Sequence, residues 1–201
     1  MSDRKDDSWI QTYTGKQFWP MSCREEDIDI KDIAHALSLV NRYQGHTKFP
    51  FSVAQHCLLG LLIINRLIIS DDKRNIDFDF NRDFKKAWML HDASEAYICD
   101  LARPIKRFFP EYKNVEEDLQ YCIETRYDCR LIDKESIKML KRIDNTCLYF
   151  ERRQLMATPS IPWKEHDTID VSIIREPIIR DYGWKYNESE FLAECEILGI
   201  K

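Results

Sequence analysis

Residues 52–69, SVAQHCLLGLLIINRLII, decide the fold class of this chain. The opening letters SVAQ have the form of a capping box, which satisfies the exposed amide donors at the start of a helix. The apolar run that follows is interrupted by Asn65 and Arg66, and it is shorter than the ~20 residues that a membrane-spanning helix needs. The stretch therefore predicts a core helix from Ser52 to about Ile69, and we expect no membrane partner.

The sequence on both sides of this helix favours further helices over a sheet. Only five glycines occur, and the seven prolines leave residues 51–103 and 111–158 free of the strongest helix breaker. Asp29 and Asn187 are placed as N-caps of the first and the last of these helices. Apolar residues at helical spacing predict an all-α protein with further helices over residues 30–43, 84–97, 113–127, 134–157 and 188–198.

Two stretches lack a helical period. Residues 70–83 are highly charged and predict a surface loop, whereas residues 159–186, with three prolines and two tryptophans, predict a lid or a packing arm. A length of 201 residues with 44% apolar residues suits a single domain. We expect residues 1–157 to form its core and residues 158–201 to form a C-terminal extension that packs on the same domain.

The charge and the cysteines narrow the class of protein. A formal net charge of −5 argues against the broad basic field with which proteins attract long nucleic acids. A small anionic substrate stays compatible with this charge, because a metal ion and a few basic side chains can reverse the field inside one pocket. Seven cysteines without a C-x-x-C pair or a secretory leader indicate reduced thiols in the cytoplasm. We also expect a homo-oligomer.

Four side chains point to a metal site. His91 and Asp92 are adjacent in a predicted helix, but a His-Asp pair is common by chance and indicates little alone. His56 lies on the apolar face of the helix that begins at Ser52, and Asp144 lies on the inward face of its own helix. Either would be costly to bury without a partner, and a shared metal ion would satisfy both. The sequence therefore predicts a metal site made of His56, His91, Asp92 and Asp144.

Two imidazoles and two carboxylates suit one divalent metal ion such as Zn²⁺, Mn²⁺ or Co²⁺, with Mg²⁺ an option where substrate phosphates share the ion. Such an ion lowers the pKa of bound water and neutralises charge on a phosphoryl group. This is the chemistry that phosphate-ester hydrolysis requires.

The order H…HD…D of these residues resembles the HD superfamily of metal-dependent phosphohydrolases. More narrowly, the motifs NRYQGH, SVAQH, HDASEAY and DLARPIK are similar to those of the YfbR-type 5′-deoxynucleotidases and of the related bacteriophage dATP triphosphohydrolases of the DatZ type. The likeness spans about residues 9 to 150 and implies an HD-type helical bundle. It also implies one metal ion and not two, because two-metal HD enzymes carry extra histidines between the HD pair and the last aspartate, and this chain has no histidine between residues 92 and 144.

The same likeness further implies that the carboxylates of Glu95 and Asp100 position water or move a proton, and that Arg42, with Lys106 as a further candidate, contacts the substrate phosphate. We expect Arg42 at the pocket rim near the end of its helix. His46 directly follows Gly45, where a loop could bring it to the pocket mouth and the substrate.

The resemblance implies hydrolysis at the α-phosphorus of a deoxynucleotide. The stretch DIDIKDIAHALS, residues 27–38, is similar to the phage branch and favours a dNTP triphosphohydrolase that releases triphosphate and prefers deoxyadenosine nucleotides. The alternative is a 5′-deoxynucleotidase that releases orthophosphate from dNMPs. Two other classes stay open: a non-catalytic nucleotide-binding module, and a structural helical protein in which histidines such as His35 and His46 only cap or pack.

Overall fold

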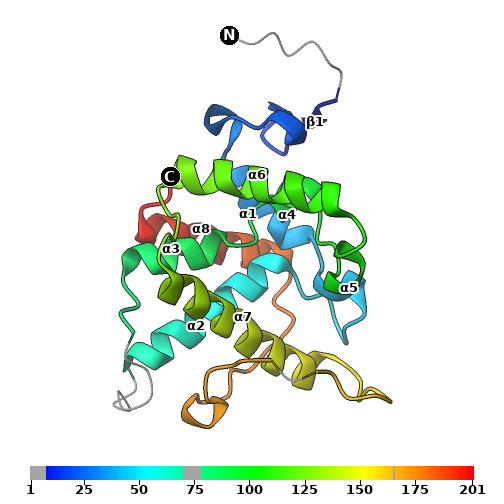
Figure 1. The fold of residues 1–201 in the computed structure, drawn as a ribbon, viewed down its shortest axis with the longest axis vertical. Coiled ribbons are helices and arrows are strands. Elements are labelled where there is room, and N and C mark those ends of the chain that lie inside the picture. The colour runs from blue at the N-terminus through cyan, green and yellow to red at the C-terminus, as the bar shows by residue number, and fades with distance from the viewer. Residues whose placement is uncertain (1–7, 70–77, 165) are drawn as a thin grey trace.

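The chain folds as a single helical domain, as predicted, and the computed structural model describes residues 8–69, 78–164 and 166–201 (Figure 1). A small antiparallel hairpin near the N-terminus pairs β1 (Ile10–Gln11) with β2 (Gln17–Phe18). Across the described residues no helix combines the length and apolarity that crossing a membrane requires. The α-helices are α1 (Ile30–Leu39), α2 (Val53–Ile69), α3 (Arg82–Leu90), α4 (Glu95–Ile98), α5 (Arg103–Lys106), α6 (Pro110–Tyr127), α7 (Lys134–Leu155) and α8 (Trp184–Leu198).

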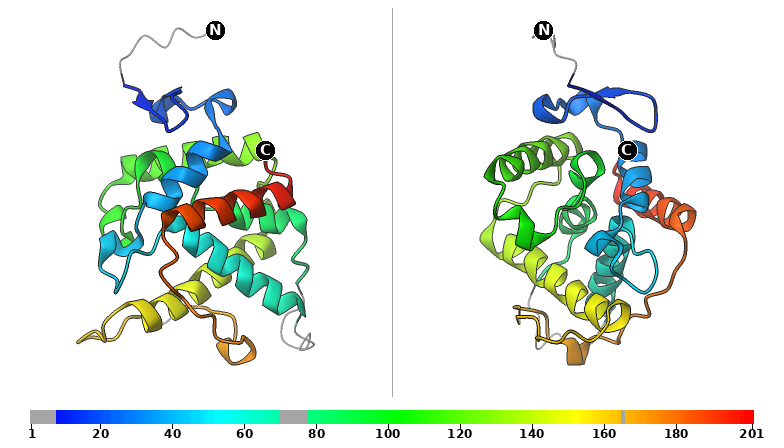
Figure 2. Two further views of the ribbon diagram at one scale, coloured as in Figure 1. Left: turned by 180° about the vertical axis from the view of Figure 1, so that it is seen from behind. Right: turned by 90° about the vertical axis from the view of Figure 1, so that its right-hand side faces the viewer.

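Helix α2 is the centre of the bundle. It contacts α1, α3, α7 and α8, and in the right-hand view of Figure 2 it lies between α1 and α8 on one side and α6 and α7 on the other. It begins as predicted, since the amide of Gln55 donates to Oγ of Ser52 at 3.2 Å. Neighbours on several sides explain why buried residues occur around most of its circumference.

Helix α2 and helix α3 meet at Gly60 and Trp88. The indole of Trp88 packs so closely on Gly60 that the backbone there has no room for a Cβ atom. Its Nε1 donates to the carbonyl of Cys57 at 2.8 Å, which satisfies the polar atom of this fully buried ring. This contact fixes the distance between the two helices.

Helix α1 starts as predicted but ends four residues early. Asp29 caps it by accepting from the amide of Lys31 at 3.0 Å. The expectation that it continues to Tyr43 is wrong, because the chain turns back after Leu39 and Arg42 donates its amide to the carbonyl of Phe51 at 2.9 Å. A 3₁₀ turn, η3 (Arg42–Gly45), follows instead, and Tyr43 takes a left-handed backbone conformation there with φ of 57°.

The prediction of a single helix over residues 84–97 is also wrong. The chain leaves the helical path after Leu90 and forms two helices, α3 and α4. Tight turns join them, and in one of these turns the amide of Glu95 donates to the carbonyl of Asp92 at 3.1 Å. Gln120 of α6 compensates for the break: its Nε2 donates to the carbonyl of Leu90, and its Oε1 accepts from the amide of Ser94. The break contains the His-Asp pair.

The C-terminal part packs across the bundle. Residues 159–164 and 166–183 form an arm that contains one short 3₁₀ helix, η4 (Val171–Ile173). The arm is hydrogen-bonded to α7, since the amide of Ile169 donates to Oγ1 of Thr146 at 3.0 Å. Of the two alternatives for this stretch, the structure shows the packing arm. The following helix α8 begins at Trp184, so the prediction of Asn187 as an N-cap is wrong, and Asn187 is instead buried inside the helix.

The predicted loop over residues 70–83 is only partly described, since residues 70–77 lie outside the described residues. Its second part is not a freely exposed loop. Phe78 and Phe80 pack edge to face on Phe84 of α3, with ring centroids 5.0 and 5.5 Å away, and Phe80 is buried.

Candidate metal centre

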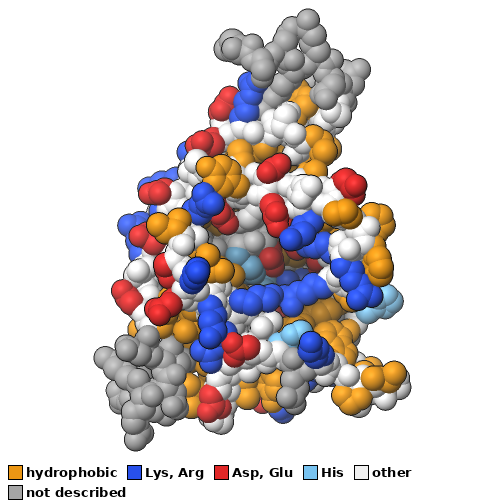
Figure 3. All heavy atoms as spheres, viewed as in Figure 1, with side chains coloured by type: hydrophobic (Ala, Val, Ile, Leu, Met, Phe, Trp, Pro, Cys, Tyr) orange, Lys and Arg blue, Asp and Glu red, His pale blue; other side chains and the backbone are white. Residues whose placement is uncertain are grey.

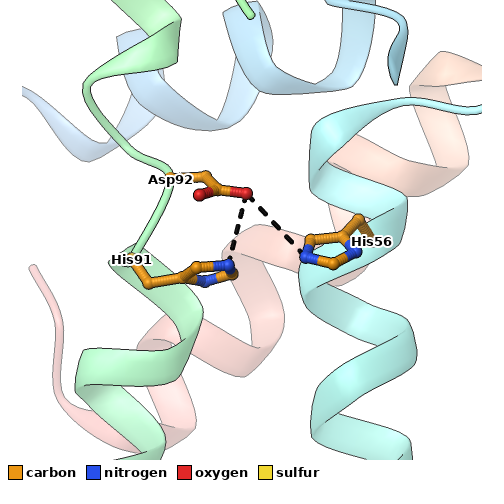
Figure 4. A group of neighbouring side chains, drawn as sticks. All are labelled: His56, His91 and Asp92. Atoms are coloured by element: carbon orange, nitrogen blue, oxygen red, sulfur yellow. Dashed lines mark ion pairs between the residues drawn. The ribbon is translucent and has the colours of Figure 1, made fainter. Parts of the chain in front are cut away.

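Three side chains from two parts of the chain converge where α2 faces the break between α3 and α4 (Figure 4). The ligand atoms of His56, His91 and Asp92 lie within 4.8 Å of one another. Oδ2 of Asp92 is 3.2 Å from Nε2 of His91 and 3.8 Å from Nε2 of His56. His56 is fully buried and the other two side chains are partly buried. This group could hold a metal ion.

Both imidazoles direct their Nε2 atoms into this group because the other ring nitrogen is occupied. Nδ1 of His56 lies 2.6 Å from Oε1 of Glu151, and Nδ1 of His91 lies 2.6 Å from the carbonyl oxygen of Trp88. Each Nδ1 is therefore the protonated nitrogen, which leaves a lone pair on Nε2. Both Nε2 atoms are buried and have no hydrogen-bond partner among the described residues. Buried atoms of this kind need an explanation, and the donor set fits a divalent metal ion.

Trp88 packs against one face of the His91 ring. Its indole stacks on the His91 ring at a centroid distance of 4.3 Å and an interplanar angle of 22°. The same indole lies 5.6 Å from the ring of His56. Because Trp88 is itself fixed against Gly60 of α2, one tryptophan holds the two histidine-bearing segments together.

Asp144 of α7 lies beside the group. Its Oδ1 is 3.7 Å from Nε2 of His56, whereas its Oδ2 pairs with Nη2 of Arg103 at 2.5 Å and with Nζ of Lys141 at 2.6 Å. Burial alone would raise the pKa of the Asp144 carboxyl, but the neighbouring imidazole of His56 and the positive charges of Arg103 and Lys141 hold it below its usual range. The structure thus keeps this carboxylate ionised, with one oxygen directed toward the histidine.

Arg42 lies inside the site and not at its rim. Its side chain is 12% exposed, with Nη1 3.3 Å from Oδ2 of Asp92 and Nε 3.4 Å from Oε2 of Glu151. Burial works against the charged guanidinium, yet the carboxylates of Glu151 and Asp92 hold the pKa of Arg42 well above its usual value. The expectation that Arg42 lies at the pocket rim near the end of a helix is therefore wrong, because Arg42 belongs to the turn η3 and its side chain is mostly buried.

Glu95 and Asp100 are close to Asp92, and the pKa values of both carboxyls are raised. Burial, together with the negative charges of Asp92 and Asp100, raises the pKa of Glu95 to about 10. Glu95 is 6% exposed, and its Oε2 has no hydrogen-bond partner among the described residues. Burial and the charge of Asp92 likewise raise the pKa of Asp100. A carboxyl that holds a proton beside metal-ligating groups is suited to proton transfer.

The remaining predicted residues are spread more widely. Lys106 is near the acidic side of the site, but its Nζ pairs with Oε1 of Glu116 at 2.6 Å. His46 is exposed at the C-terminal end of η3. His35 stacks on Tyr13 at 3.7 Å and lies 3.1 Å from Glu188, and these contacts make it a packing residue.

Sequence reasoning missed three charged residues of the site. Glu151 and Lys141 lie seven residues after and three residues before Asp144, which is helical spacing for one face of α7. That spacing could have identified them. Arg103 belongs to the same motif, DLARPIK, as the predicted Lys106. Only the structure shows that Arg103 is the one of the two that contacts Asp144.

Comparisons with known proteins give relatives but no activity. No protein-family model matches the chain. The chain is 33% identical over 148 residues to the uncharacterized protein YfdR of Escherichia coli, a stretch that covers 74% of this chain and 72% of the relative. It is also 26% identical over 152 residues to an uncharacterized protein of Rhodobacter capsulatus, covering 74% of this chain and 73% of the relative.

Proposed function

This chain belongs to the family of the Escherichia coli protein YfdR, and from that premise and the geometry of its buried site we propose that it is a metal-dependent phosphohydrolase of the HD superfamily. One observation carries the proposal: two buried Nε2 atoms, of His56 and His91, face the carboxylate of Asp92 without hydrogen-bond partners among the described residues. A divalent ion held by these three side chains and Asp144 would supply an activated water and neutralise charge on a phosphoryl group.

Basic side chains beside Asp144 support an anionic substrate. Arg103 and Lys141 have side chains that are 51% and 54% exposed, so a phosphate oxygen can reach them from solvent. Figure 3 shows a group of Lys and Arg side chains in the middle of the face that it draws, with histidine and acidic side chains next to them. In a chain of net charge −5 such a concentration of positive charge is local, which suits a small phosphorylated molecule.

Glu95 is the residue that we assign to proton transfer. Its carboxyl lies close enough to Asp92 and Asp100 for their charges to raise its pKa. It would deliver its proton to the leaving oxygen and regain one from water, while Asp100 and Arg42 hold the surrounding charges in place. Arg42 further orients Asp92 through the 3.3 Å contact.

For the substrate we propose deoxynucleotides cleaved at the α-phosphorus, with dATP-like triphosphates preferred. The observation that favours this substrate is the similarity of residues 27–38 to the phage branch of triphosphohydrolases, and these residues lead into α1 and form all of it except Leu39. The motifs shared with 5′-deoxynucleotidases favour the second candidate, release of orthophosphate from dNMPs. Both reactions use in-line attack of water on the same phosphorus.

A product analysis tests the proposal. The protein is stripped of metal, supplied with Mn²⁺, Co²⁺, Zn²⁺ or Mg²⁺, and incubated with each dNTP and each dNMP, and the products are separated by anion-exchange chromatography. We expect deoxyadenosine and triphosphate from dATP. Orthophosphate from dNMPs would establish the second candidate. Nucleotide binding without hydrolysis under every metal would show a non-catalytic module and contradict the proposal.

A further inference from the structure

Glu151 is a fully buried carboxylate near the C-terminal end of α7, and the proposed reaction does not use it. A buried charge of this kind is costly unless donors surround it. Glu151 has two such donors and one ion pair: Nδ1 of His56 lies 2.6 Å from Oε1, the Tyr43 hydroxyl donates to Oε2 at 2.5 Å, and the charged guanidinium of Arg42 brings its Nε to 3.4 Å from Oε2. One carboxylate oxygen therefore contacts the histidine, and the other contacts the turn η3.

The contact on Oε1 decides the tautomer of His56. An ionised carboxylate only accepts hydrogen bonds, so Nδ1 of His56 must carry the proton. A neutral imidazole protonated on Nδ1 has its lone pair on Nε2, the atom that faces Asp92 and Asp144. With the opposite tautomer, an N–H group would point into the site and could not bind a cation.

The contacts on Oε2 decide where the carboxylate lies. Tyr43 reaches Glu151 from a left-handed backbone conformation, with φ of 57°, which a bulky residue adopts at a cost. Its hydroxyl and the guanidinium of the neighbouring Arg42 together hold the Oε2 side of Glu151. The turn η3 thus positions the carboxylate from a site 108 residues away in the chain.

We propose that Glu151 is a positioning residue for the metal ligand His56, holding the ring in the tautomer that directs Nε2 at the metal, and that Tyr43 in turn positions Glu151. The inference rests on the proposed metal site and adds a residue that neither the motifs nor the order of the ligands includes. Carboxylates that orient a ligating histidine typically change metal affinity about ten- to a hundredfold when removed.

The first test reads the tautomer directly and needs no metal. Long-range ¹H–¹⁵N correlation spectra of the metal-free protein, labelled with ¹⁵N-histidine, distinguish a proton on Nδ1 from one on Nε2 in neutral His56. We expect Nδ1–H in the wild type and in Glu151→Gln, whose amide oxygen still accepts a hydrogen bond. In Glu151→Ala we expect a shift toward Nε2–H. A wild-type spectrum with the proton on Nε2 would overturn the proposal.

The second test measures Zn²⁺ and Mn²⁺ affinity by competition with a chromophoric chelator. We expect affinity to fall by about ten- to a hundredfold in Glu151→Ala, and by less in Glu151→Gln and Tyr43→Phe. Circular dichroism checks that each variant is folded, and if the alanine variant is not, the two milder variants carry the test. Unchanged affinity in all folded variants would contradict the proposal.

The matched control is Glu188→Ala, because Glu188 lies 3.1 Å from Nδ1 of His35 and forms a histidine–glutamate pair outside the site. We expect its metal affinity to equal that of the wild type. The two proposals fail separately: a wild type that binds metal and keeps the Nδ1–H tautomer, yet hydrolyses no nucleotide, would overturn the proposed function and support the role of Glu151.

Discussion

Oδ1 of Asp144 lies 3.7 Å from Nε2 of His56, so helix α7 meets helix α2 at the edge of the candidate metal site. This places the carboxylate within a short movement of a common ligand position. We expect Asp144→Ala to lower the bound metal and to abolish hydrolysis, because it removes one of four proposed ligands. Elemental analysis and the nucleotide assay measure both effects. Full metal content and normal turnover would exclude Asp144 from the site.

His56→Ala and Asp92→Ala should have the same double effect. Each side chain supplies an atom of the three-residue group within 4.8 Å, so either substitution leaves that group incomplete. The readouts are metal content by mass spectrometry and turnover with dATP. His166→Ala is the control, since that histidine is exposed and we expect it to leave both values unchanged. Metal retained in either site variant would refute the ligand set.

Glu95→Gln should keep the metal but lose most turnover. The amide preserves the shape of the side chain but cannot exchange a proton with water or a leaving group, an effect of about 10²–10⁴-fold on rate. Single-turnover kinetics together with metal analysis measure the two properties on the same sample. If metal is lost along with activity, Glu95 is a ligand and its assignment to proton transfer is wrong.

The raised pKa of Glu95 also predicts a pH dependence of stability in the metal-free protein. The native carboxyl keeps its proton up to a pH of about 10, whereas the unfolded one loses it near its usual value of about 4.3. Between these values the native state binds more protons, so the contribution of Glu95 is complete below about pH 4 and is lost as the pH rises toward 10. We expect Glu95→Gln to melt above the wild type at pH 8.

The melting temperatures of both proteins, measured from pH 5 to pH 8, check this expectation. The gain of Glu95→Gln over the wild type should grow with pH, and exposed Glu111→Gln should show no such trend. A constant difference between Glu95→Gln and the wild type over this range would show that the native carboxyl is already ionised.

Arg42→Lys should weaken nucleotide use and also destabilise the protein. A lysine cannot contact Asp92 and Glu151 at once, as the planar guanidinium does. Removing a charge-assisted hydrogen bond costs about 1.5–3 kcal/mol, which corresponds to on the order of a tenfold to hundredfold decrease in kcat/KM. Because only 12% of the side chain is exposed, the melting temperature should fall too. Kinetics and stability equal to those of the wild type would make Arg42 a dispensable ion pair.

The fold was predictable where local pattern decides it and not where distant partners do. The capping box at Ser52 and the apolar face of α7 are properties of neighbouring residues, and the helices they predict are present. Helix α1 ends early because its continuation pairs with Phe51. The break after Leu90 depends on Gln120, which takes up the groups that the break exposes, and no pattern within residues 84–97 reveals that partner.

The candidate metal site was predictable to the extent that histidines and aspartates follow one another in the order H…HD…D along the chain. His56, His91 and Asp92 come together in the structure, and Asp144 lies next to them. Glu151 was not predicted because a glutamate near the end of a charged helix looks like any solvated carboxylate until its buried partners are known. The contact of Tyr43 with Glu151 depends on a left-handed turn, which the helical pattern over residues 30–43 had hidden.

The fit of Trp88 against Gly60 has a consequence for how this family can change over evolutionary time. A side chain larger than hydrogen at position 60 would displace the indole, and the indole is what stacks on His91. A relative with alanine or serine at position 60 therefore needs a smaller ring or an aliphatic residue at position 88. Its histidine at position 91 would then need a different support. We expect the two positions to covary across homologues, so that glycine and tryptophan are inherited together or lost together.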